Sequence, residues 1–159
     1  MRLRDSAFVN VFIHTHRGMH SQWSDPMINV MFWHVTLVDQ SWLWRASKTG
    51  KNDFEPTDVD VRNCLFRSMG SFKPLAEFNG GLTVGNCAFY GKDKKGKPNG
   101  LYGDNAIAIA RTFKDEAAHD FCTTDPAALK HGVELQCVPT DVNGNPYPAG
   151  PRPVGAYAR

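Results

Sequence analysis

One stretch near the start of the chain decides how the fold is interpreted: Ala7-Phe8-Val9-Asn10-Val11-Phe12-Ile13-His14-Thr15-His16. Successive side chains of a β-strand point to opposite faces. The alternation therefore predicts a strand over residues 7–15. We expect Val9, Val11 and Ile13 to share one face, with Phe8, Phe12 and the two histidines on the other.

Further strands follow from the same type of pattern. Residues 28–38 and 42–46 are rich in β-branched and aromatic side chains and flank a short polar turn. With residues 7–15 they predict an antiparallel β-meander at the N-terminal end. Residues 82–90 and 133–138 are predicted to be later strands.

Two or three helices are expected between these strands. Thr57 or Asp58 can cap a helix whose apolar positions include Val61, Cys64 and Leu65. A short helix is predicted after Asp125, over 125–132. Residues 104–121 alternate like a strand at first, but they also carry a helical stripe, so the state of 104–112 stays open, with a helix favoured over the second half.

The predicted fold class is therefore α+β: an antiparallel sheet, two or three helices and an extended Pro/Gly-rich C-terminal tail. We expect one domain over 1–138, without internal repeats. The tail, 139–159, holds too many prolines and glycines for regular structure. It is expected to lie on its own domain or on a partner.

Composition excludes several classes of protein. The chain has 159 residues, ordinary apolar content and a net charge of +2, so nucleic acid is not an expected partner. No apolar run is long enough for a transmembrane segment, and no signal peptide is expected. A cytoplasmic location or an assembled particle fits these features. The four cysteines have no C-x-x-C spacing, and the sequence does not decide the disulfide state of Cys64, Cys87, Cys122 and Cys137.

The histidines of the first strand form the candidate metal site. His14 and His16 share a strand face, and His20 can add a third nitrogen from the following loop. Such a site suits a divalent metal such as Zn and a small metal-dependent hydrolase. The segment Ile13-His14-Thr15-His16 resembles the opening motif of PHP-type phosphoesterases. The later ligand series of that family is missing here, so its function is not carried over.

Cys87, with His131 downstream, is the candidate nucleophile and base of a cysteine hydrolase. The order of the two residues loosely resembles that of CHAP and papain-like amidases. A small buried side chain on a strand is the competing interpretation of Cys87.

The aromatic residues lead to the favoured functional hypothesis. Trp33, Trp42, Trp44 and Tyr147 are candidate interface residues, because tryptophan and tyrosine are enriched at protein contacts. We expect a non-enzymatic structural subunit of a larger assembly, for instance a viral or phage particle. Its partners would be other protein subunits, in a homo-oligomer or a larger assembly, with no membrane. This hypothesis assigns no cofactor, whereas the alternative hydrolase would use a divalent metal such as Zn.

Overall fold

The computed structural model describes residues 4–14, 19–21, 27–40, 44–46, 57–68, 81–91, 101, 103–110, 113–118 and 120–157. Two parallel sheets dominate these residues. The first sheet has the strand order β1 (Arg4–Val9), β4 (Ile28–Trp33), β7 (Thr57–Arg62) and β9 (Leu82–Gly85). The second contains β2 (Phe12–His14), β5 (Thr36–Gln40), β8 (Leu65–Ser68), β10 (Ala88–Tyr90) and β11 (Ile107–Ala108).

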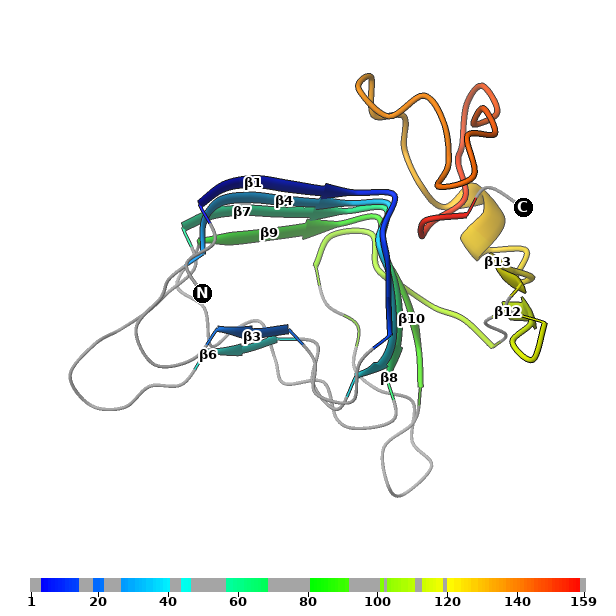
Figure 1. Ribbon diagram of the computed structural model, residues 1–159, viewed down its shortest axis with the longest axis horizontal. Coiled ribbons are helices and arrows are strands. Elements are labelled where there is room, and N and C mark those ends of the chain that lie inside the picture. The colour runs from blue at the N-terminus through cyan, green and yellow to red at the C-terminus, as the bar shows by residue number, and fades with distance from the viewer. Residues whose placement is uncertain are drawn as a thin grey trace.

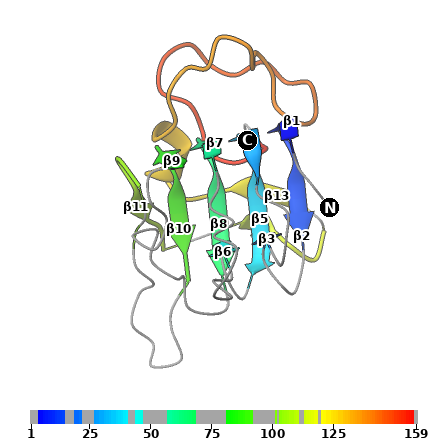
Figure 2. The same ribbon diagram turned by 90° about the vertical axis from the view of Figure 1, so that its left-hand side faces the viewer.

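The chain winds through these sheets as a parallel β-solenoid. Each coil passes along the first sheet, turns a sharp corner and continues along the second, as Figure 1 shows. In the first two coils a third side follows, where β3 (Met19–Ser21) pairs in parallel with β6 (Trp44–Ala46). A fifth, shorter coil runs from Gly103 through β11. Figure 2 shows the second-sheet strands side by side in the order of their coils.

A single residue in the left-handed backbone region makes each corner. In the first four coils these residues are Asn10, His34, Asn63 and Asn86, all with φ of 53–54°, and in the fifth coil Asn105 has φ 52°. Asparagine tolerates this conformation better than other residues that have a Cβ. The backbone ladder continues through the corner, because Asn10 N donates to Trp33 O and the same bond recurs between later coils. We call these five residues the corner ladder.

Apolar side chains stack in columns inside the solenoid. Phe8 stacks on Phe32 with ring centroids 4.9 Å apart, and Phe66 lies 5.1 Å from Phe89 in the second sheet. Phe32 and Leu37, in the second coil, are at most 1% exposed. Equivalent residues of successive coils lie next to each other, so each coil buries the apolar surface of its neighbour.

The predicted α+β class is wrong. Strands are the dominant regular structure of the described residues, and the longest helical element among them is the short 3-10 helix η2 (Ala128–Lys130), inside the predicted helix 125–132. Residues 57–68 form β7 and β8 instead of a helix. The region 104–121 contains β11, β12 (Phe113–Asp115) and β13 (Asp120–Thr123), of which the last two form an antiparallel hairpin.

The predicted antiparallel meander is also wrong, since β1, β4, β7 and β9 are parallel. Residues 133–138 form no strand. The expectation of no internal repeats is wrong as well, because the coil is a repeated structural unit. The number of residues per coil varies from one coil to the next. No helix in the described part of the chain has the length and apolar character needed to cross a membrane.

Candidate functional site

A cluster of buried polar side chains lies where the C-terminal segment crosses the corner ladder. Residues 131–157, called here the strap, run outside the junction of the two sheets (Figures 1 and 2). The first half of the strap runs from the later coils towards the first coil: His131 O accepts from Asn86 Nδ2 at 3.4 Å, and Thr140 O accepts from Asn10 Nδ2 at 2.5 Å. The strap then returns to the middle coils, where Gly155 N donates to Asn63 O at 2.7 Å. It therefore ties the coils together lengthwise.

Asn63 holds the strap with both ends of its amide. Val133 N donates to Asn63 Oδ1 at 3.0 Å, and Asn63 Nδ2 donates to Val133 O at 2.7 Å. Since a backbone N–H can only donate, this pair fixes the orientation of the amide. The second proton of Nδ2 then points to His34 Nε2, 2.9 Å away.

His34 is the one histidine in the corner ladder and is fully buried. Its Nε2 accepts from Asn63, so the proton of the neutral ring lies on Nδ1, which makes no hydrogen bond of good geometry to any described residue. Burial lowers the pKa of His34 to about 4; the Gly155 backbone opposes this change, and the positive charge of Arg152 adds to it. The ring is therefore neutral around pH 7.

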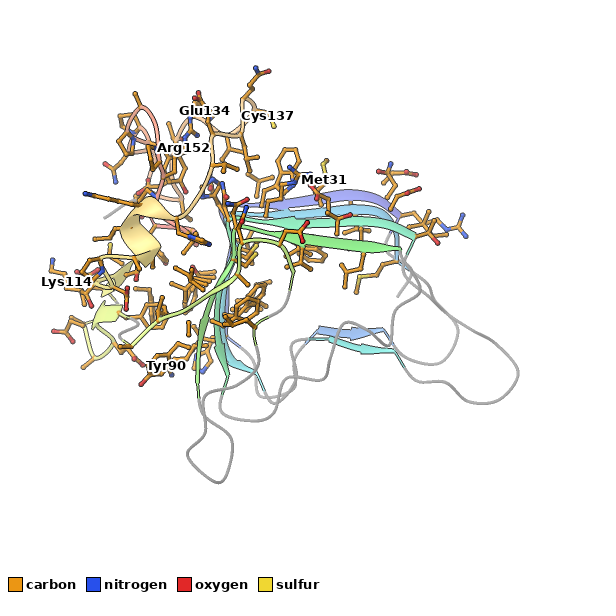
Figure 3. The ribbon with its side chains drawn as sticks, turned by 180° about the vertical axis from the view of Figure 1, so that it is seen from behind. Met31, Tyr90, Lys114, Glu134, Cys137 and Arg152 are labelled. Atoms are coloured by element: carbon orange, nitrogen blue, oxygen red, sulfur yellow. The ribbon has the colours of Figure 1, made fainter. Side chains whose placement is uncertain are left out.

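Tyr147 and Arg152 complete this buried cluster. The ring of Tyr147 packs on His34 with centroids 4.5 Å apart, and its hydroxyl donates to Asn10 Oδ1 at 3.2 Å. Burial raises the pKa of Tyr147 above its usual value. Arg152 lies over the same ring, donates to Val138 O at 2.7 Å and pairs with Glu134 at 3.1 Å. Figure 3 shows Arg152 and Glu134 together at the strap. These contacts can hold the strap.

The outer face of the first sheet carries a second polar group. Trp33 Nε1 donates to Asp60 Oδ2 at 2.7 Å, and Arg62 Nε lies 2.9 Å from both oxygens of the same carboxylate. Trp33 and Val9 also pack against Leu135 and Val138 of the strap. The charge of Asp60 is therefore balanced within the sheet.

The predicted metal site is only partly within the described residues. His14 lies exposed at the end of β2, paired with Val38 of β5. His16 and the side chain of His20 lie outside the described residues. Within the described ranges, no three His, Cys, Asp or Glu side chains form a group that could hold a metal ion. The His14/His16/His20 site stays a prediction.

The structure does not bring the predicted cysteine and histidine together. Cys87 is fully buried in the inner core, where its Sγ donates to Gly85 O at 3.2 Å. His131 lies in the strap outside the corner, and its Nε2 contacts Asn105 O. The wall of the solenoid separates the two residues, so the geometry supports the interpretation of Cys87 as a small core side chain.

Two of the four predicted interface aromatics have described side chains. Tyr147 is buried against its own corner ladder, and half-buried Trp33 packs against the strap. Trp42 and the side chain of Trp44 lie outside the described residues. The contacts seen for Trp33 and Tyr147 are thus made within the chain.

The inward apolar side chains are less buried at the two ends of the solenoid than in its middle. In the first coil, Phe8, Val11 and Ile13 are only partly buried. Their counterparts in the second coil, Phe32, Val35 and Leu37, are at most 1% exposed. At the other end Leu82 and Ala106 are again only partly buried.

Comparison with known proteins finds no match to any family model, any curated protein or any solved structure.

Sequence reasoning missed the corner ladder and the solenoid ends. A sequence signal for the first four corners was present: an apolar residue, any residue, Asn or His, and then a second inward-facing residue. This pattern occurs at Phe8–Val11, Phe32–Val35, Val61–Cys64 and Val84–Cys87.

Proposed function

We propose that the chain is a non-enzymatic structural subunit of a larger protein assembly, and that it joins other subunits through the ends of its solenoid. The observation that carries the proposal is the contrast in burial between the first and second coils. Phe8, Val11 and Ile13 belong to the same inward columns as fully buried residues, yet they retain exposed surface. One more layer of β-structure would bury them.

Such burial is a substantial driving force. Complete burial of a large apolar side chain contributes about 1.5–3 kcal/mol relative to full exposure. Three half-buried side chains in one layer therefore favour association. A sheet edge also offers backbone groups for pairing with another chain.

The chemistry of the described residues agrees with a structural role. His34, Cys87 and Asp60 are held in internal contacts that serve packing. A subunit of this kind would act in the cytoplasm or within an assembled particle.

Light scattering of the purified chain over a range of concentrations tests the proposal. Ser6 faces inward at the first end and is half-buried, so Ser6→Lys places a charge where the added layer would pack. Ala117→Lys is the matched control, because Ala117 lies exposed in the turn between β12 and β13.

We expect assemblies above the monomer mass for the native chain and for Ala117→Lys, and a lower mass for Ser6→Lys. Circular dichroism and thermal unfolding show whether each variant is folded. A native chain that stays monomeric at every concentration contradicts the proposal.

A further inference from the structure

Resting on the proposed function, we propose that the partner is a second copy of this chain, stacked head to tail with its first coil on the fifth coil of its neighbour. The surface on the first copy comprises Gly103–Ala108. The surface on the second copy comprises β1 and β2 with the corner residue Asn10 between them.

The inward columns of the two ends match in register. One column runs through Val11, Val35, Cys64, Cys87 and Ala106. Its three middle members are buried in the inner core, and Val11 and Ala106 at its ends are partly buried against that core. A second column runs through Ile13, Leu37, Phe66 and Phe89 and ends at Ala108, which is exposed. In the stacked pair, Val11 of the second copy follows Ala106, and its Ile13 follows Ala108. Small residues at one end thus meet large apolar residues at the other.

The backbone ladder can continue across the junction by the same rule that joins the coils. Within the chain, each corner N–H donates to the carbonyl before the next corner, as in Asn86 N to Asp104 O. The second residue after a corner donates back, as in Ile107 N to Cys87 O.

In the stack, Asn105 N would donate to Val9 O of the second copy. Phe12 N of that copy would donate to Ala106 O. The asparagines Asn105 and Asn10 would become neighbours in a continuous corner ladder.

Stacking of two first ends would not preserve these relations. The facing β1 strands would have to be antiparallel, and the left-handed corners would not coincide. Head-to-tail contacts use different surfaces on the two copies, and stacking along the solenoid axis does not return to the first copy, so the contacts repeat as an open filament. Five layers of about 4.8 Å each predict an axial repeat of about 24 Å in the filament.

Chemical cross-linking tests the order of the ends. Ala7 and Asp104 are both exposed, and Asp104 would lie beside Val9 of the second copy, two residues from its Ala7. Spacings of about 4.8 Å across strands and about 3.3 Å per residue place the two Cβ atoms about 8 Å apart. A short bismaleimide can bridge this distance.

The experiment uses Ala7→Cys and Asp104→Cys chains in a Cys122→Ser/Cys137→Ser background, since the other two cysteines are buried. We expect cross-linked dimers when the two chains are mixed and little product from either alone. A chain with both substitutions should give a ladder of dimers, trimers and larger products. Adding Ser6→Lys should abolish it. Ala117→Cys mixed with Ala7→Cys is the control and should give no dimer.

The outcomes separate this inference from the proposed function. Cross-linking of Ala7→Cys with itself would show that first ends meet, and it would overturn the head-to-tail order only. Assembly by light scattering without the mixed cross-link would do the same. A folded chain that gives no cross-link and remains monomeric overturns both proposals.

Discussion

Asn63 engages the strap through both polar atoms of its amide while its backbone occupies the left-handed corner. Asn63→Gly keeps the corner conformation available but removes the bonds to Val133 and His34. We expect the free energy of unfolding to fall by about 2–3 kcal/mol, because a buried ring nitrogen also loses its donor. Urea denaturation measures the change.

Asn105→Gly is the control at the exposed corner of the fifth coil. Both substitutions have the same effect on the flexibility of the unfolded chain, so the difference between them reports the amide contacts of Asn63. Equal losses in the two variants would show that these contacts contribute little.

His34 predicts a specific pH dependence of stability. Its pKa is about 4 in the folded chain and about 6.5 when unfolded, so between these values the unfolded state binds more protons. The stabilisation is complete above about pH 6.5 and is lost as the pH falls towards 4. The loss is on the order of 3 kcal/mol. Denaturation at a series of pH values measures it.

His34→Asn is the matched variant, because asparagine occupies every other position of the corner ladder. It removes the titrating group, so we expect a flatter stability profile over the same pH window. The ring packing on Tyr147 is also lost, which lowers stability at neutral pH by a constant amount. An unchanged slope would assign the pH dependence to other groups.

At the scale of elements, the positions of several strands were predictable from the sequence. Which side chains point inward and which strands pair with each other were not. The predicted strands 7–15, 28–38 and 82–90 each contain two strands separated by a left-handed corner. That corner shifts the alternation by one residue. Phe8 therefore points inward with Val11 and Ile13, contrary to the face expected from simple alternation.

The same shift explains the helix wrongly predicted to begin at Thr57 or Asp58. Val61 and Cys64 are both inward, three residues apart, because a corner lies between them. Three-residue spacing of apolar side chains is also the helical signal. The Asn or His at each corner could have revealed the difference; the uneven length of the coils hid the repeat.

The strap packs so closely on the coils at Gly155 that one added methyl group should destabilise the protein. A Cβ on Gly155 would lie 2.5 Å from Thr36 Oγ1 and 3.1 Å from Leu65 Cβ, and Gly155 has φ +90°. Gly150 has a similar φ of +87° but no neighbouring atom within 4 Å. We expect Gly155→Ala to destabilise the protein more than Gly150→Ala, by at least about 1 kcal/mol. Thermal unfolding of the two variants compares them, and equal shifts would contradict the close fit.

At the scale of the whole molecule, the four thiols report which residues form the interior. Cys64 and Cys87 occupy neighbouring coils in the inner core, and burial raises the pKa of Cys64. We expect Cys137, which is exposed, to react rapidly with Ellman's reagent, while Cys64 and Cys87 react only after unfolding. Rapid reaction of Cys87 in the folded chain would return the cysteine hydrolase to consideration.

The path of the strap has a consequence for the order of folding. Its contacts to the first coil join residues 130 and 137 positions apart, as in Asn10 with Thr140 and with Tyr147. During synthesis the coils emerge one by one, and the segment that ties them emerges after all five coils. Each nascent coil can pair with the one before it. The contacts that tie the first coil to the strap must wait until Thr140 and Tyr147 have been synthesised. In refolding of the full chain, the large sequence separation of these contacts should place them among the slowest to form.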